Sequence, residues 1–584
     1  MTPRRSSALC LCALLLAGAA GAQNSDPLKE FPLENVERGA LGYGLSVFSG
    51  TEPEPFNVEV IGLVRNLHPD TSFILARLTG HGLERSGVVA GMSGSPVYID
   101  NQLAGAVAYS WAFTHEAVAM ITPIGAMRDL GSLPRVPSAA APASTTFEQL
   151  ATGKIPEAEL ERHLAALLPR GMSGAGSQLQ FTTAGFGAAT RARLAQALGA
   201  VAPAGSSPDL DTELTAGSAV AAVLIGGDLE MAASGTVTER RGDEVTAFGH
   251  PYLGLGTIQI PMAPAEVITV VSTQANSFKL TNVGPVVGAF EEDRMAGIFG
   301  HIGAEAPTIP MQINVLGGSN SHYEVELAKL LTTPTLAAVA ILEAMDTTRG
   351  QNGDQDIEMR AHIEIAGHDP IELSQHFSGT SASISSALYL LSIVGFVHNN
   401  GTEEAEIERI QVDLTQASQP RTVSLIAAHA AKRNVRPGEQ LDIHLDLRRY
   451  RGETFRETVT VELPTDAPKG PYYVFIGDSA AIDSARLQMQ PRQPQDFSES
   501  LELLRSFHGP DELVILGVVP ARGLIVDGEA LPSLPGSIRS IWAAAGPRAA
   551  KAANLAIRDQ QTRPLGYPLA GAARIDLNVL APLD

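Results

Sequence analysis

The sequence predicts a mainly β protein of several domains, with two small β-barrels, a later β-sandwich and helical segments between them. Its 584 residues correspond to about three or four domains at roughly 150 residues each. Two blocks, 31–135 and 216–325, consist of short apolar runs broken by turn residues, which is typical of a compact antiparallel barrel or sandwich. A third block, 404–490, alternates apolar and polar residues over about seven short runs, which favours an immunoglobulin-like sandwich without its disulfide.

The first residues, "MTPRRSSALCLCALLLAGAAGAQ", have the pattern of a secretory signal peptide. Two arginines precede an apolar stretch, and the small residues Ala20 and Ala22 have the spacing that signal peptidase reads. We therefore expect residues 1–22 to be removed and the protein to be exported to the periplasm, the cell envelope or the medium. Both cysteines, Cys10 and Cys12, lie in this segment, so the mature chain has no thiol for a disulfide, a metal site or a nucleophile.

The runs "GYGLSVFSG", "FNVEVIGLV" and "SFILARLTG" predict strands of the first barrel. The stretch "PRVPSAAAPAS" that follows is typical of a linker. Three helices are then predicted in a connector over 136–215, from "TFEQLA", "PEAELERHLAALL" and "AATRARLAQALGAV", the second with Pro156 in its first turn.

Turn residues at 226–228 and 240–243 predict hairpins in the second barrel. The segment 326–403 is predicted to be helical, from "PTLAAVAILEAMD" and the apolar run "ALYLLSIVGFV". That run is shorter than the roughly 18 to 20 residues that cross a bilayer, so we expect a buried helix and no transmembrane segment after signal cleavage. The last segment, 491–584, mixes a helix, "FSESLELLRSF", with strands.

Composition excludes some partners. The chain has 41 basic and 63 acidic residues, a net charge of −22, and no basic block. Because binding to polyanions depends on clustered Lys and Arg, we expect no nucleic-acid partner. No His or acidic pair has metal-ligand spacing, and "GLG" at 254–256 lacks the context of a dinucleotide loop, so we expect no metal and no cofactor.

The turn "GMSGSP", residues 91–96, places one serine between glycines, before a hairpin. Such a turn can expose the hydroxyl of Ser93 and leave backbone N–H groups free to stabilise an oxyanion. It has the form of the G-x-S-G turn of the chymotrypsin-like fold, in which the N–H groups of Gly91 and Ser93 would form the oxyanion hole. The alternative is a β-turn without chemistry.

A serine hydroxyl is a weak nucleophile until a base takes its proton, and histidine, with a pKa near 6.5, is the expected base. Among the fourteen histidines, His250 in "VTAFGHPYLG" stands at the end of a strand, between the turn residues Gly249 and Pro251. The alternative is that His250 is a structural residue of the turn, without a role in chemistry.

Several stretches together resemble the SpoIVB-type (sporulation stage IV B) serine peptidase family. They are "FNVEVIGLV", "GMSGSPVYIDNQLAGAVAY", "GTVTERRGDEVTAFGH" and "AGIFGHIG", within about 39–126 and 217–302. The resemblance implies a chymotrypsin-like two-barrel core, with Ser93 as nucleophile and His250 as general base. It also implies a protein or peptide substrate.

Two features depart from the family pattern. The serine segment precedes the histidine segment here, as if the halves were permuted, which catalytic geometry tolerates because it is defined in space. The family also has an aspartate shortly before the serine, where this chain has Thr79, Gly80 and His81. An orienting carboxylate is then expected from elsewhere, or the site works as a Ser/His dyad; the candidate acids are Asp100, Glu116, Asp243 and Asp293.

The sequence thus favours a secreted serine endopeptidase that acts through Ser93 and His250 by an acyl-enzyme mechanism. The alternative is a catalytically inactive peptidase scaffold that binds an envelope or extracellular partner. The sequence does not specify the oligomeric state.

Overall fold

The computed structural model describes most of the chain from residue 29 onward. The predicted signal peptide, with Cys10 and Cys12, lies outside the described residues. Those residues are 29–68, 71–132, 134, 145–167, 176–177, 179–199, 201–317, 320–348, 354–401, 403, 405–417, 419–491, 494–526, 529–531, 533–544 and 551–581.

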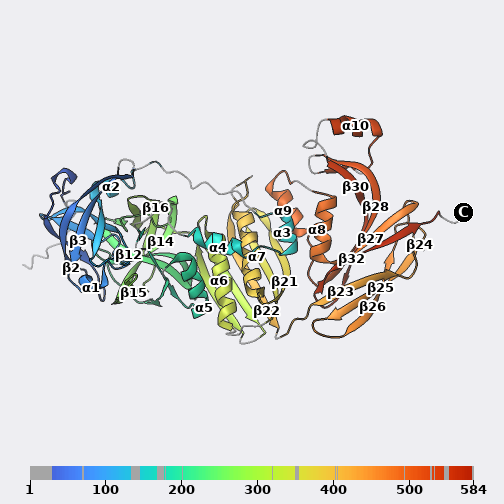
Figure 1. Ribbon diagram of the computed structural model, residues 1–584, viewed down its shortest axis with the longest axis horizontal. Coiled ribbons are helices and arrows are strands. Elements are labelled where there is room, and N and C mark those ends of the chain that lie inside the picture. Colours follow the sequence, from blue (N-terminus) through green and yellow to red (C-terminus); the bar gives the residue numbers. More distant parts are fainter. Residues whose placement is uncertain are drawn as a thin grey trace, which may run out of the picture.

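The first barrel closes from six antiparallel strands, and it lies at one end of the molecule (Figure 1). Its strand order is β4-β1-β2-β3-β6-β5, and pairing of β4 with β5 completes the ring. Alternate residues point inward, as Val58 and Val60 of β2 do, and pack with Ile74 and Leu78 of β3 in one core. The elements are η1 (Leu33–Asn35), β1 (Leu41–Ser46), β2 (Glu54–His68), β3 (Thr71–Thr79), α1 (Leu83–Ser86), β4 (Pro96–Ile99), β5 (Gln102–Ser110), β6 (Val118–Pro123) and α2 (Ile124–Arg128).

The second barrel also closes from six strands, in the order β14-β16-β17-β13-β12-β11, with β11 pairing back to β14. The hairpin turns predicted at 226–228 and 240–243 connect β11 to β12 and β12 to β13. The predicted mainly β fold with two barrels is therefore confirmed. The elements are β11 (Ala219–Gly227), β12 (Glu230–Arg241), β13 (Glu244–Ala247), β14 (Gly256–Val271), β15 (Phe278–Val283), β16 (Gly288–Arg294) and β17 (Gly297–Ile302).

The two barrels meet where the serine turn of the first lies on β12 of the second. Thr236 donates its backbone N–H to the carbonyl of Ser93 at 2.7 Å. Arg128 of the first barrel and Glu239 of β12 add an ion pair at 2.6 Å, with both side chains largely buried. The predicted serine and histidine segments are thereby brought to one interface.

The sheet continues from the second barrel into a third unit, because β19 pairs with the end of β11. Two helices, α6 and α7, pack against each other and on this part of the sheet (Figure 1). The apolar run from Ala387 lies in α7 and is buried, as predicted. Among the described residues, no helix is both long and apolar enough to span a bilayer. The elements are β18 (Thr308–Leu316), β19 (Ser321–Ala328), α6 (Thr333–Thr348), β20 (Gln355–Ile365), β21 (His368–Gly379), α7 (Ala382–His398) and β22 (Ile407–Ala417).

The structure divides the segment 326–403 differently from the helical prediction, because β20 and β21 lie between the two helices. From Ile357 onward, residues of β20 alternate between buried and less buried positions with period two, which is the pattern of a strand rather than a helix. In the connector 136–215 the three predicted helices are present. The elements are α3 (Phe147–Thr152), α4 (Ala158–Ala165), β7 (Gly176–Ser177), β8 (Gln180–Ala184), α5 (Ala188–Leu198), β9 (Val201–Pro203) and β10 (Gly205–Ser206).

At the other end of the molecule, two sheets share one apolar core (Figure 1). One has the order β26-β25-β23-β31, and the other the order β24-β32-β27-β28-β29, with β30 paired to β28. The elements are β23 (Val423–Ala430), β24 (Asn434–Val435), β25 (Gln440–Arg449), β26 (Thr454–Glu462), β27 (Gly470–Asp478), α8 (Ser479–Met489), α9 (Phe497–Arg505), β28 (Glu512–Val526), β29 (Glu529–Leu531), α10 (Gly536–Ala544), β30 (Lys551–Pro564), β31 (Leu569–Ala570) and β32 (Ala572–Val579).

These sheets do not follow the boundaries predicted for the sandwich, 404–490. The strand β22 belongs to the sheet of the preceding unit, where it pairs with β18 and β20. Strands from 491–584 complete the C-terminal sheets. Local alternation predicts that a segment is a strand, but not which distant strand it pairs with. The immunoglobulin-like topology stays a prediction.

Candidate active site

The serine turn is tight, and glycine is required at two of its positions. Met92 donates its N–H to the carbonyl of Val89, and Ser95 donates to that of Met92. Gly91 and Gly94 have φ values of 96° and 92°, in the region that side chains disfavour. A Cβ at Gly94 would lie 2.0 Å from the carbonyl oxygen of Thr236, so only glycine lets the turn approach β12 this closely.

The carbonyls of this turn are all engaged. Thr236 donates its hydroxyl to the carbonyl of Gly91 at 2.9 Å and its N–H to that of Ser93 at 2.7 Å. Thr238 donates its hydroxyl to the carbonyl of Gly94 at 2.7 Å. The N–H groups of Gly91 and Ser93, in contrast, have no acceptor among the residues that the structure describes. The N–H groups of the two predicted oxyanion-hole residues are thus available to bind an oxyanion, while β12 holds the turn through its carbonyl groups.

The structure brings Ser93 and His250 together across 157 residues of sequence. The Nε2 atom of His250 lies 2.9 Å from the Oγ of Ser93. Its Nδ1 atom lies 2.7 Å from the carbonyl oxygen of Pro251. Because a carbonyl oxygen only accepts, Nδ1 carries the ring proton, and Nε2 accepts the hydrogen bond from the Ser93 hydroxyl. This is the tautomer that a general base needs.

Both side chains are buried. Ser93 is 1% exposed and His250 is 0% exposed. The rings of Tyr109 and Phe248 lie 5.7 Å and 6.1 Å from the imidazole, measured between centroids. This burial lowers the pKa of His250 to about 4, although the hydrogen bond to Pro251 acts in the opposite direction. The imidazole is therefore neutral at pH 7.

None of the four candidate acids contacts Nδ1 of His250. Asp100 lies in the β4–β5 turn, Asp243 lies in the β12–β13 turn, and Glu116 forms an exposed ion pair with Arg77. The carbonyl of Pro251 occupies the position expected for an orienting carboxylate.

Asp293 instead holds the loop that follows His250. Its carboxylate accepts four backbone N–H bonds of 2.6 to 3.3 Å, and the donors are Tyr252, Leu253, Gly254 and Leu255. Burial raises the pKa of Asp293, while the four hydrogen bonds lower it. Asp293 thus fixes the backbone beside the Pro251 carbonyl, and through it the orientation of His250.

Sequence reasoning missed a buried polar cluster behind the serine turn, formed by Ser46, Ser95 and Lys279. Lys279 donates from Nζ to the Oγ of Ser46 at 2.9 Å, and Ser95 donates to the same oxygen at 2.9 Å. Burial lowers the pKa of Lys279 to about 7. The sequence signal is weak: in "FKLTNV" the lysine shares the inward face of β15 with Thr281 and Val283.

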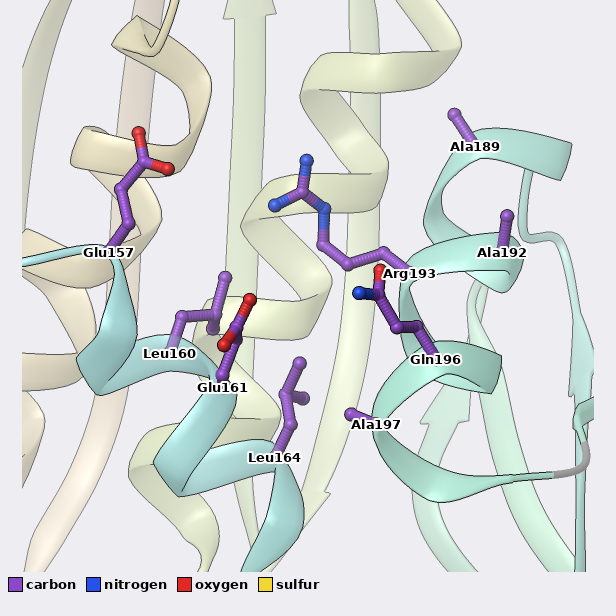
Figure 2. Close-up of a pocket in the computed structure, with 9 residues that line it drawn as sticks. All are labelled: Glu157, Leu160, Glu161, Leu164, Ala189, Ala192, Arg193, Gln196 and Ala197. Atoms are coloured by element: carbon purple, nitrogen blue, oxygen red, sulfur yellow. The ribbon is translucent and has the colours of Figure 1, made fainter.

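A groove of about 460 Å³ lies elsewhere, between α4 and α5 (Figure 2). In Figure 2, Leu160 and Leu164 face the groove from one helix, and Arg193 and Gln196 face it from the other. Neither Ser93 nor His250 lines it. Among the described residues, no group of three or more His, Cys, Asp or Glu side chains is placed to hold a metal ion.

Comparison with known proteins identifies the segment that carries the serine turn. No match was found among curated proteins or among solved structures. One protein family matches, by a model that covers most of the first barrel and ends before the second barrel begins. Residues 25–117, the segment that contains Ser93, match the model described as SpoIVB peptidase S55.

Proposed function

We propose that the protein is a serine endopeptidase that hydrolyses peptide bonds through Ser93 and His250. The observation that carries the proposal is the 2.9 Å contact between Ser93 Oγ and His250 Nε2. It is supported by the Pro251 carbonyl, which accepts from Nδ1, and by the two N–H groups of the turn that have no acceptor among the described residues. The family match of residues 25–117 supports the same reaction class.

In the proposed mechanism, His250 Nε2 takes the proton of the Ser93 hydroxyl as Oγ bonds to the substrate carbonyl carbon. The carbonyl electron pair moves to oxygen, and the N–H groups of Gly91 and Ser93 stabilise this oxyanion. His250 then gives its proton to the departing amine, and the C–N bond breaks to leave an acyl-enzyme. Water, deprotonated by His250, attacks the ester, and Ser93 Oγ recovers the proton as the acid product leaves.

The Pro251 carbonyl fixes the tautomer but carries no full negative charge. It therefore stabilises the imidazolium that forms in the transition state less than a carboxylate would. We propose accordingly that the site is a Ser/His dyad with slower turnover than a site with a carboxylate in that position. The reversed order of the two segments, with the serine first, does not affect this geometry.

We further propose that the enzyme acts outside the cytoplasm on protein substrates. The signal-peptide pattern of residues 1–22 supports export. The family of the matched segment supports a protein substrate.

One observation favours a second candidate function, an inactive scaffold that binds an envelope or extracellular partner. Ser93 and His250 are both buried, so a substrate reaches them only if residues that cover them move. In that case the Ser93–His250 contact would serve to join the barrels.

Labelling with a fluorophosphonate probe distinguishes the two, because the probe reacts with an activated serine. The proposed enzyme becomes labelled, and mass spectrometry places the adduct on the peptide that contains Ser93. Ser93→Ala abolishes labelling, whereas the matched control Ser110→Ala, a buried serine of β5, retains it. A folded wild-type protein that takes up no probe would favour the scaffold.

A further inference from the structure

We propose that Lys279 is a positioning residue of this site: its amine anchors Ser46 and Ser95 behind the serine turn and thereby holds the oxyanion donors in place. The inference rests on the proposed function. It assigns a role to a buried lysine that the mechanism itself does not use.

The contacts form one chain from β15 to the turn. Lys279 Nζ donates to Ser46 Oγ, and Ser95 Oγ donates to the same atom, both at 2.9 Å. Ser95 Oγ also lies 3.5 Å from the hydroxyl of Thr236, which donates to the carbonyl of Gly91. The amine is thus connected, through hydroxyl groups alone, to the peptide unit beside the proposed oxyanion hole.

Two further contacts place Lys279 directly against the turn. Its backbone N–H donates to the carbonyl of Ala90 at 3.1 Å. Its aliphatic stem packs on Gly91, since a Cβ built on that glycine would lie 3.1 Å from Cδ of the lysine. The carbonyl of Ala90 and the N–H of Gly91 belong to one peptide unit, so the backbone and stem of Lys279 fix the direction of that N–H, and the amine anchors the stem through Ser46.

Stability alone does not explain a lysine at this position. The side chain is 2% exposed, and its amine donates to a hydroxyl, with no carboxylate paired to it among the described residues. Burying an amine without a counter-charge is unfavourable, and an apolar side chain of the same length is often neutral or stabilising in such a place. Burial also lowers the pKa of this amine to about 7, so the uncharged form is well populated at neutral pH. A buried amine that folding does not favour, next to the reacting groups, points to a role in the site.

The test compares Lys279→Met, which keeps the stem and removes the amine, with wild type. Because displaced oxyanion donors slow acyl transfer strongly, we expect kcat and the rate of fluorophosphonate labelling to fall about 10- to 100-fold. KM is expected to stay close to that of wild type, since the substrate does not contact this amine. The thermal midpoint is expected to stay equal or to rise, because Met removes a buried polar group. A purely structural role predicts the opposite, a lower midpoint with unchanged kcat.

A second variant shows whether the effect passes through Ser46. Ser46→Ala removes the shared acceptor, and the double variant Ser46→Ala/Lys279→Met should be no slower than the slower single variant, because both changes break one chain. Lys329→Met is the control, since that lysine pairs with Glu406 away from the site. If Lys279→Met does not fold, Ser46→Ala alone carries the test.

The outcomes separate the two proposals. Wild-type labelling rates in folded Lys279→Met, or in folded Ser46→Ala, would overturn the positioning role and leave the proposed peptidase intact. Independent, additive losses in the double variant would also overturn it. A wild-type protein that is not labelled would overturn the proposed function and this inference together.

Discussion

The pKa of His250 predicts an unusual acid limit for the reaction. The general base must be neutral, and burial lowers the pKa of this imidazole from its ordinary 6.5 to about 4. At pH 5.5 a pKa of 4 leaves about 97% of the imidazole neutral, whereas an exposed histidine would be only about 9% neutral. In a variant in which Lys279 does not titrate, the labelling rate should therefore be nearly constant down to about pH 5 and reach half its maximum near pH 4.

The assay measures the second-order rate of labelling by an uncharged fluorophosphonate between about pH 3.5 and 8, at roughly half-unit steps. Lys279→Met is measured in parallel, because the amine, with its pKa of about 7, otherwise titrates within the same range. Protonation of Asp293, whose pKa is raised by burial, acts in the same direction as protonation of His250, because it weakens the hydrogen bonds that hold the loop beside the imidazole. An inflection near pH 6.5 in Lys279→Met would refute the claim that burial lowers the pKa of His250.

The lowered pKa of His250 also makes the free energy of unfolding depend on pH. The unfolded histidine binds a proton below pH 6.5, but the folded one binds it only below about pH 4. The contribution of His250 to the free energy of unfolding is therefore complete above pH 6.5, and it falls by up to about 3 kcal/mol as the pH drops to 4. Circular dichroism at each pH confirms that the labelling profile reports on folded protein.

Further predictions concern the backbone around the two residues. Gly94→Ala places a Cβ 2.0 Å from the Thr236 carbonyl at a positive φ, so it should lower the free energy of unfolding of the barrels by about 3 kcal/mol or more. Gly242→Ala, also at a positive φ but with open space around it, is the control, and an equal loss in a chemical denaturation series would contradict the steric argument. Asp293→Asn keeps the shape but accepts fewer hydrogen bonds from the loop, so it should destabilise the protein by about 1 to 3 kcal/mol and slow labelling. Full labelling rates in that variant would show that the loop does not orient His250.

Local motifs identify Ser93 and His250 as candidate site residues. Ser93 is predictable because glycines on both sides define a turn, and His250 because it ends a strand beside Gly249 and Pro251. Their contact could be expected only from the family resemblance, since no local pattern links residues so far apart. Strand spacing predicts compact β blocks, but the sequence pattern does not specify that six strands form each barrel or which strands close each ring.

The residues that support the pair could not be predicted, because their roles depend on long-range contacts. Thr236 and Thr238 look like ordinary strand residues until β12 lies beneath the serine turn. Asp293 is predictable as an acid near the site, yet it binds backbone N–H groups rather than the imidazole. Lys279 carries no motif, and only the packing of β15 against the turn reveals its contacts.

Peptide-bond hydrolysis by the purified protein tests the central claim most directly. Cleavage of a casein-type substrate is followed by the appearance of new amino termini in wild type, Ser93→Ala, His250→Ala and the double variant. The account predicts cleavage by wild type and nearly equal, almost complete loss in all three variants, because nucleophile and base act as one unit. Cleavage by folded Ser93→Ala at the wild-type rate would contradict it.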